Sequence, residues 1–478
     1  MITYRFSLVA AAALALAACT VGPDYVRPAA PTPAAFKEAE GWKPARPRDE
    51  VPRGRWWSVF GDPALDDLEA QVDISNQNIK LAEARVHQAR ALTQQARAAF
   101  FPTVDASASA TRAGGRGGSS AGAGTGVSGG AVGNFYNLAL DANWELDLWG
   151  RVRRNVESNE AGTQASIADL EAAKLSAQAE LAQDYLLLRV QDAQIDLLAT
   201  TAAAYEKSLQ LTRNQYAAGV VGRSDVVQAE TQYKATQAQV LDARIVRAQL
   251  EHAIAILIGK PPAEFSIAVV PIDYAFPDIP VGMPSELLER RPDIAAAERR
   301  IAAANAQIGV AQAAFFPTLT LSATGGFAAS SFANWLTAPA RYWSLGPALL
   351  AQTVFDAGLR SAQKEQAIAI YDQTVAAYRE TVLTGFQEVE DDLVALRVLG
   401  EEAGVQDDAV KAAREAVTIV NNQYRAGTAN YIAVVVLQAA ALNNERTALG
   451  IRGRRLAASV GLIKALGGGW SATSLAQQ

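Results

Sequence analysis

Side chains that commonly carry out catalysis or bind metals are scarce in this sequence. The 478 residues include two histidines, His87 and His252, and a single cysteine, Cys19. A disulfide within the chain and a zinc site of the Cys₂His₂ or three-histidine type are therefore excluded, and a histidine-based catalytic triad has little support. Neither histidine has a second ligand four residues further on. The sequence predicts no cofactor, no metal site and no enzymatic activity.

Charge and composition narrow the class of protein further. Apolar residues make up 50% of the chain and charged residues 19%, which is typical of a folded protein rather than a disordered one. The formal net charge is −6 and no block of basic residues occurs, so we expect no nucleic acid among the partners.

The single cysteine ends a segment typical of exported bacterial proteins. Arg5 precedes an apolar run from Leu8 to Ala18, which at about eleven residues is too short to span a bilayer but suits a secretory signal. Leu16-Ala17-Ala18-Cys19 resembles a lipobox, in which a cysteine after small residues is lipidated and becomes the first residue. We expect lipid on Cys19; a signal peptide with an accidental cysteine is the alternative.

An internal duplication organises the rest of the chain. Two motifs each occur twice, in the same order: Ala98–Pro102 recurs as Ala313–Pro317, and Asn214-Gln215-Tyr216 recurs as Asn422-Gln423-Tyr424. The copies differ in length only in the segment after the first motif. There the first copy contains the glycine-rich stretch Ala113–Gly133, which we interpret as an exposed loop because loops absorb insertions.

The duplication predicts the domain organisation. The predicted segments are a signal peptide at 1–18, a lipidated N-terminal tether at 19–61, repeat 1 at 62–259, an equatorial connector at 260–284, repeat 2 at 285–467 and a tail at 468–478. Each repeat begins with a predicted helix, Asp66–Ala99 or Ser285–Ala314, which the proline of Phe-Phe-Pro ends.

Two strand-like runs follow in each repeat. We predict strands at about 103–111 and 135–148 in repeat 1, and at about 317–327 and 342–355 in repeat 2. Apolar and polar residues alternate between Tyr136 and Leu148. In repeat 2 the residues that share one parity are Trp343, Leu345, Leu349, Ala351 and Phe355. Alternation over about ten residues, with aromatic residues near the ends, is typical of transmembrane β-strands.

A very long helix and a return helix complete each repeat. As one helix, Gly150 to Tyr216 would extend roughly 100 Å. A turn near Gly219 leads into a return helix that ends near Gly259, and we interpret Ser224-Asp225 as its N-cap. Abundant alanine favours close packing of such helices side by side.

The strand count has a consequence for assembly. A sheet inside a bilayer must close, because open edges leave unpaired backbone groups in hydrocarbon. The smallest such barrels have about eight strands, so the four strands of one chain cannot close alone. Three copies supply twelve strands, and we expect a homotrimer that forms a duct through a membrane.

Several long motifs, in order along the chain, resemble the outer-membrane efflux channels of the TolC-like superfamily, in particular its NodT or OprM-like lipoprotein subgroup. The matching motifs are Cys19–Tyr25, Trp56–Pro63, Trp144–Arg151, Pro284–Ile294 and Ala313–Pro317.

The resemblance implies a mixed α and β membrane protein built from two tandem repeats of helix, β-hairpin and long helical hairpin. It implies a homotrimer that closes a 12-stranded β-barrel and a 12-helix periplasmic α-barrel with an equatorial belt, in contact with outer-membrane lipid. The implied partners are a periplasmic adaptor (membrane fusion) protein and, indirectly, an inner-membrane pump of the resistance-nodulation-division (RND) type. The chain would be the passive outer-membrane exit duct of that tripartite system.

By the same resemblance, the two helix turns form the periplasmic tip, where related channels carry acidic residues after the second glycine. Here the stretch Gly427–Val436 has no charge. We therefore predict that packing by side chains such as Tyr431 and Val436, rather than an acidic ring, makes the constriction. The candidate tip residues are Tyr216, Gly219, Arg223, Asp225, Tyr424, Gly427, Tyr431 and Val436.

From the residues alone, two other classes stay open. A lipid-anchored periplasmic coiled-coil lipoprotein without channel activity explains the anchor and the long helices, but not the amphipathic hairpins between them. An enzyme requires a polar cluster that the sequence does not show. Trp56 and Trp57 could bind a ligand, but we interpret them as anchors of the N-terminal segment.

Overall fold

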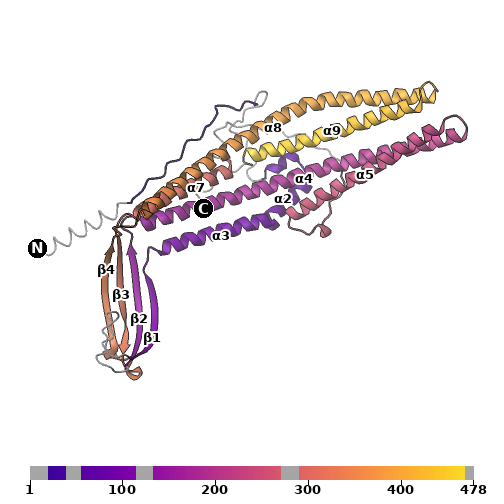
Figure 1. The fold of residues 1–478 in the computed structure, drawn as a ribbon. Helices are drawn as coiled ribbons and strands as arrows, with labels where there is room; N and C mark the ends of the chain where they lie inside the picture. Colours follow the sequence, from indigo (N-terminus) through magenta and orange to yellow (C-terminus); the bar gives the residue numbers. More distant parts are fainter. Residues whose placement is uncertain (1–19, 39–54, 115–132, 271–289, 469–478) are drawn as a thin grey trace. The chain divides into compact units, whose positions relative to one another are not determined.

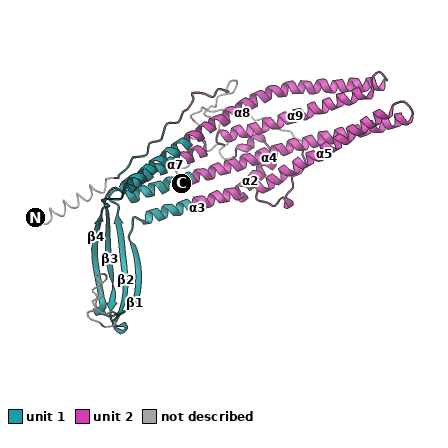
Figure 2. Ribbon diagram, viewed as in Figure 1, with its two compact units in different colours: residues 1–28, 87–165, 298–377 teal, residues 29–86, 166–297, 378–478 magenta. Residues whose placement is uncertain are grey.

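The structure of the chain is a computed structural model. It describes residues 20–38, 55–114, 133–270 and 290–468. Cys19, the signal peptide and most of the Ala113–Gly133 loop lie outside the described residues. The chain divides into two compact units, shown in Figure 2. Unit 1 comprises residues 1–28, 87–165 and 298–377, and unit 2 comprises residues 29–86, 166–297 and 378–478.

Unit 1 contains one antiparallel sheet in the order β1-β2-β3-β4 (Figure 1). The strands are β1 (Thr103–Ala113), β2 (Gly133–Leu146), β3 (Thr318–Ala329) and β4 (Arg341–Ala351). Repeat 1 supplies the first two strands and repeat 2 the other two, so the pairing of β2 with β3 joins the repeats in one sheet. Two short 3₁₀ turns, η3 (Phe332–Asn334) and η4 (Ala338–Ala340), lie between β3 and β4.

Strands β2 and β4 end earlier than predicted, because side-chain hydrogen bonds hold the backbone in the turn that leads into the next helix. After β2, the carboxylate of Asp147 accepts the backbone N–H groups of Val152 and Arg153, both at 2.9 Å. After β4, Arg360 donates to the carbonyl oxygen of Thr353 at 2.7 Å. Residues 352–355, predicted as strand, therefore belong to a turn that leads into a helix.

The parity predicted for repeat 2 is wrong in β4. Ala323 pairs with Leu345, whereas Leu321 pairs with Ala348, so β4 contains one extra residue across this β-bulge. Because side chains alternate along a strand, one extra residue moves every later side chain to the opposite face. Leu349 consequently lies on the face opposite to Leu345.

Two helical hairpins follow the strands, and their lengths match between the repeats. Helices α4 (Arg151–Ala217) and α8 (Leu359–Arg425) have 67 residues each, and α5 (Arg223–Leu257) and α9 (Tyr431–Ala465) have 35 each. The turns contain Gly219 (φ 75°) and Gly427 (φ 72°), in the left-handed region that favours glycine. Within the described ranges, no helix is long and apolar enough to cross a membrane.

The single helix predicted over Asp66–Ala99 is wrong: two helices, α2 (Pro63–Ser75) and α3 (Gln77–Ala98), occupy this stretch. Asn76 separates them with an extended backbone (φ −61°, ψ 126°). Its side-chain oxygen accepts the N–H of Ile79 at 3.1 Å, so the asparagine caps α3. The apolar pattern continues through this break, which is why it predicts one helix.

The two repeats end in the same way. Gly259 follows α5 with φ 68°, and Gly467 follows α9 with φ 90°. A Cβ atom at Gly259 would collide with the carbonyl oxygen of Ser75, and one at Gly467 with that of Arg290. In repeat 2 the described helix is α7 (Pro292–Ala313), and residues 285–289, predicted as its start, lie outside the described part.

The connector begins after α5 and includes the 3₁₀ turn η2 (Pro262–Glu264). Buried ion pairs hold its described part in place. Asp192 of α4 accepts hydrogen bonds from Arg189 at 3.1 Å and from Arg247 of α5 at 2.6 Å. Arg247 also donates to the carbonyl oxygen of Ile267 at 2.7 Å. Removing one member would leave a buried charge uncompensated, which is strongly destabilising.

Trp56 and Trp57 pack inside unit 2, within the 3₁₀ turn η1 (Trp56–Phe60). Both side chains are buried, and their rings meet edge to face with centroids 5.8 Å apart. This burial favours the interpretation as packing anchors over a ligand site.

Candidate functional site: a two-faced sheet and a helical tip

The sheet of unit 1 has one polar and one apolar face. The register places one row of side chains across the four strands on the polar face: Asp105, Asp141, Thr324 and Ser344. The next row lies on the opposite face and is apolar: Val104, Ala142, Ala323 and Leu345. Exposed side chains that share this apolar face by alternation include Leu140, Trp144 and Trp343.

Charged residues of the strands are sorted by face. The strands contain three carboxylates, Asp105, Asp141 and Glu145, and all lie on the polar face. They contain two arginines, Arg112 and Arg341, and both lie on the apolar face, near the ends of the strands away from the helices. An acidic, polar face can line an aqueous path, and an apolar face can contact lipid.

The segment after Cys19 contacts the junction between β2 and α4. The N–H of Val21 donates to the carbonyl oxygen of Trp149 at 3.1 Å. Gly150 has φ 82°, and a Cβ there would lie against Thr20. Thr20, the first described residue, is thereby fixed at the junction of sheet and helix in unit 1.

At the tip of unit 2, a hydrophobic cluster joins the two helical hairpins. Its buried members come from all four long helices: Leu209 of α4, Ala229 of α5, Val420 of α8, and Tyr431 and Val434 of α9. We call this set the tip cluster. Burial of these side chains is the main stabilisation that holds the hairpin ends together.

Two tyrosines of repeat 2 add polar contacts to the tip cluster. The rings of Tyr424 and Tyr431 meet edge to face at 5.5 Å. The hydroxyl of Tyr424 donates to Oε1 of Gln215 at 2.9 Å, and the hydroxyl of Tyr431 lies 3.2 Å from that of Ser208. Both partners belong to α4, so repeat 2 supplies the rings and repeat 1 the polar partners.

The predicted tip residues fall into buried and exposed groups. Tyr431 is only 3% exposed and packs inside the chain, whereas Val436 is 60% exposed and Tyr216 46% exposed. Asp225 lies in the first turn of α5. Burial, followed by the negative charge of Asp225, raises the pKa of Tyr424, so these two side chains are neighbours.

The N-cap predicted at Ser224-Asp225 is wrong. Helix α5 begins at Arg223, with Gly222 in the cap position and no side-chain hydrogen bond. The hydroxyl of Ser224 donates to Oδ1 of Asp225 at 3.2 Å instead. Repeat 2 does have a side-chain cap, because Asn430 accepts the N–H of Ala433 at 3.1 Å.

Sequence reasoning missed several members of the tip. Gln215 belongs to the repeated Asn-Gln-Tyr motif, which could have indicated a shared role with Tyr424. Leu209 and Val420 carry no local signal, because an apolar residue on a long helix does not indicate which helix it contacts.

Both histidines are exposed, His87 on α3 and His252 on α5. Among the residues that the structure describes, no group of three or more potential ligands could hold a metal ion.

Equivalent positions of the two long helices carry carboxyl groups with raised pKa values. In α4, burial and the nearby charge of Glu180 raise the pKa of Asp184 to about 6. In α8, burial and the charges of Glu388 and Asp391 raise the pKa of Asp392 to about 7. Unit 2 therefore contains carboxyl groups that change charge near neutral pH.

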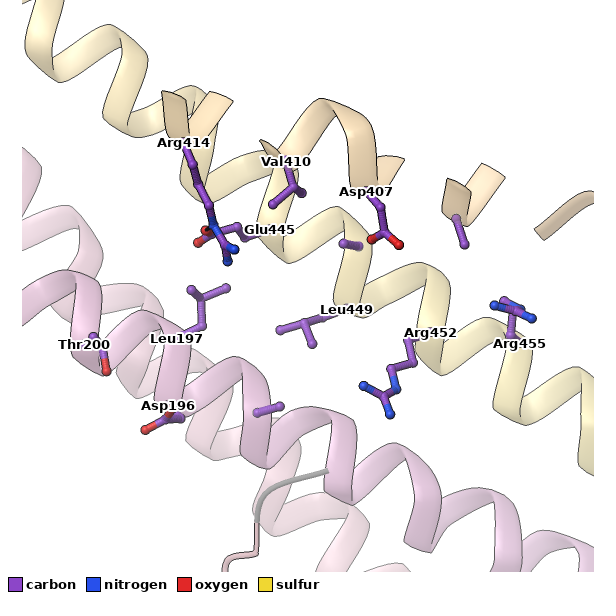
Figure 3. Close-up of a pocket in the computed structure, with 13 residues that line it drawn as sticks. Asp196, Leu197, Thr200, Asp407, Val410, Arg414, Glu445, Leu449, Arg452 and Arg455 are labelled. Atoms are coloured by element: carbon purple, nitrogen blue, oxygen red, sulfur yellow. Dashed lines mark hydrogen bonds and ion pairs between the residues drawn. The ribbon is translucent and has the colours of Figure 1, made fainter. Parts of the chain in front are cut away.

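A groove of about 590 Å³ lies between α4, α8 and α9 (Figure 3). Its lining includes Leu197, Val410, Leu449, Arg414, Glu445, Arg452 and Arg455. Arg414 pairs with Glu445 at 2.5 Å. Burial and the like charge of Arg452 lower the pKa of Arg455.

Comparisons with known proteins agree with this architecture. The outer membrane efflux protein family matches residues 70–260 and 283–468, one stretch for each repeat. The toluene efflux pump outer membrane protein TtgF of Pseudomonas putida is 33% identical over 473 residues, which cover 96% of each chain. The pyoverdine export outer membrane protein OpmQ of Pseudomonas aeruginosa is 32% identical over 420 residues, which cover 87% of each chain. The solved structure of the outer-membrane channel OprN has a TM-score of 0.87 and 33% identity, and the similarity covers 95% of this chain and 100% of that one.

A two-faced membrane sheet continued by long helical hairpins defines the class of TolC-like outer-membrane channels. The chain belongs to the outer membrane efflux protein family. It is located in the outer membrane, extends into the periplasm and serves as the exit duct of a tripartite efflux system, with an adaptor and an inner-membrane pump as partners.

Replacement of Asp392 should change how stability depends on pH. The pKa of Asp392 is raised in the folded protein, so the unfolded chain loses the proton at lower pH, and stability falls as pH rises towards about 7. Asp392→Asn removes this loss. We expect a gain on the order of 1 kcal/mol at pH 8 and little change near pH 4, measured from melting temperatures. Glu401→Gln, at an exposed position further along α8, is the control, and an equal gain from it would contradict the assignment.

The two tip residues Tyr431 and Val436 should behave differently on truncation. Tyr431→Ala removes a buried ring, which costs about 3–5 kcal/mol. Val436→Ala trims an exposed side chain and should change stability by no more than about 0.5 kcal/mol. Hydrogen exchange of peptides around Leu209 and Val420 measures the effect locally. Unchanged protection there in Tyr431→Ala would show that the tip cluster does not hold the hairpins together.

Proposed function

We propose that three copies of this chain assemble edge to edge into a closed twelve-stranded barrel, continued by a twelve-helix tube. One observation carries the proposal: β1 and β4 lie at the edges of the sheet, and among the described residues each is paired on one side only. In hydrocarbon, such edges leave N–H and C=O groups unpaired, which costs several kcal/mol per group. Three four-stranded sheets joined in this way form a barrel of ordinary size, with the polar face inside.

We further propose that the partner pump is of the RND type and that substrate selection lies outside this chain. The relatives are named for toluene and for pyoverdine, which differ widely in chemistry. The polar face carries Asp, Ser, Thr and Asn side chains, which form a generic aqueous path rather than a specific binding site.

We propose that the tip cluster keeps the periplasmic end of the duct narrow. Tyr431 is buried in the tip cluster, where it helps to hold the two helical hairpins together. This position supports the predicted role of side-chain packing at the tip. Val436 and Tyr216 are exposed in the single chain and are the candidates to face the axis, with Asp225 as the nearby acidic side chain.

Disulfide cross-linking between strand edges tests the trimer. Cysteines introduced at Ser109 in β1 and at Ser344 in β4 lie on the two outer edges, so oxidation in the membrane should link neighbouring copies into dimers and trimers on a denaturing gel. Cysteine pairs at nearby positions on both strands are tested in the same way, so that the pair that matches the register between copies is included.

A matched pair of cysteines within one chain serves as the control. Ser107 and Ala139 face each other in the register of β1 and β2, so cysteines there should form a bond without raising the mass. A membrane-inserted channel that stays monomeric by native mass measurement would contradict closure by three copies.

We propose that Cys19 carries the lipid anchor. Support comes from Thr20, which is bonded directly to Cys19 and is fixed where the sheet ends, at the expected level of the membrane surface. Mass spectrometry of the mature N-terminus should find a lipidated Cys19. Cys19→Ala should weaken anchoring without releasing the channel, provided that export proceeds. A fully soluble exported variant would instead favour the lipid-anchored rod.

A further inference from the structure

We propose that the apolar face of the sheet contains a binding site for a phosphorylated lipid of the outer leaflet, with Gly325 opening a notch for an acyl chain and Arg341 binding the phosphate. The proposal rests on the proposed function, in which this face meets the lipid of the outer membrane.

The notch is a cavity of about 350 Å³ on the sheet surface. Its lining includes Leu138, Leu140, Gly325, Phe327, Arg341 and Trp343. Leu140, Gly325 and Trp343 are direct neighbours across β2, β3 and β4. Because Gly325 has no side chain, the row is open at its centre, between a leucine and a tryptophan.

The packing of the described residues leaves room for a Cβ atom at position 325. At the next residue, Gly326, a Cβ would collide with the carbonyl oxygen of Leu138, so a side chain is excluded there. At Gly325, by contrast, an added Cβ meets no atom within 4 Å. A glycine in the interior of a strand weakens the strand, and often marks a place where another molecule approaches closely. The missing side chain of Gly325 leaves the notch open.

Arg341 stands at the end of the notch that is farther from the helices. It is exposed, lies on the apolar face, and its guanidinium group is 6.0 Å from the ring centre of Phe327. Both arginines of the strands lie on this face and all three carboxylates lie on the other, so the face is apolar with positive charge at one end only.

The length of β4 places Arg341 at the lipid headgroups. The strand has 11 residues from Arg341 to Ala351. At a rise of about 3.3 Å per residue and a tilt of about 40°, it spans about 25 Å along the membrane normal, which is the height of the apolar band of such barrels. When Ala351 lies at the periplasmic edge, Arg341 lies at the outer edge, where lipid phosphates are located.

An aromatic cluster marks the same level. Phe332 lies edge to face with Tyr136 at 5.6 Å and beside Trp335 at 5.9 Å, just beyond the notch. Aromatic residues gather at the interfaces of membrane barrels. An arginine at this depth costs little, whereas at the bilayer midplane it costs about 2–4 kcal/mol. Its guanidinium group can form two parallel hydrogen bonds to a phosphate.

Native mass spectrometry of the assembled channel in detergent tests the site, with lipid A as the probe. The same lipid with its phosphates removed is the second probe. We expect the intact channel to bind the phosphorylated lipid roughly tenfold more tightly than the dephosphorylated one. Arg341→Gln should abolish this preference, and Gly325→Leu should weaken binding of both probes, because the leucine side chain occupies the notch, where its Cβ meets no atom within 4 Å.

Matched variants control for charge and bulk on the same face. Arg112→Gln removes the other arginine, and Ala323→Leu places a leucine two residues away on the same face of β3. Both should bind lipid like the unmodified channel, and millimolar inorganic phosphate should not displace the lipid.

The site is refuted if Arg341→Gln and Gly325→Leu bind both probes like the unmodified channel. It is also refuted if inorganic phosphate displaces the lipid, which would indicate a site for a free anion. Trimer formation and conductance, measured on the same samples, separate this result from a failure of the proposed function. A conducting trimer without lipid preference overturns the lipid site alone, and a chain that neither assembles nor inserts overturns both.

Discussion

The hydrogen-bonding requirement of the backbone in hydrocarbon governs this protein. Four strands with one apolar face can be stable in a bilayer only if both outer edges find partners. In the part of the chain that the structure describes, β1 and β4 pair on one side only. The sorting of charges has a different cause, since desolvating a carboxylate is costly and carboxylates are tolerated only on the face that meets water. In the proposed barrel, assembly is therefore a condition for inserting the sheet rather than a later addition.

The duplication provides equivalent strands and helices for this assembly twice in each chain. Each repeat supplies two strands and one long helical hairpin, and helices of 67 and 35 residues recur without change in length. Equal helices are needed where they must reach a common end, and the tip cluster unites all four of them there. Glycines with positive φ recur at the turns and at the ends of α5 and α9, because the backbone approaches its neighbours closely or reverses at those points.

The repeats have diverged where they meet other parts or the surroundings. Repeat 2 alone supplies the tyrosine pair of the tip, while repeat 1 contributes Ser208 and Gln215 as partners. The β-bulge lies in β4, and so does Arg341, while Gly325 lies in β3. A repeated scaffold thus carries unrepeated contacts at the tip in unit 2 and in the sheet of unit 1.

The sequence by itself determined the duplication, the strands and long helices to within a few residues, and the resemblance to efflux channels, because alternation, proline stops and repeated motifs are local signals. Only the tertiary structure decided the break at Asn76, the reversed faces beyond the bulge in β4 and the burial of Tyr431. Asn76 ends one helix through hydrogen bonds that do not interrupt the apolar period. The bulge depends on the register of a partner strand, and the burial of Tyr431 on helices far away in the sequence. Such facts arise from pairing between distant segments, and a pattern read along one segment does not contain them.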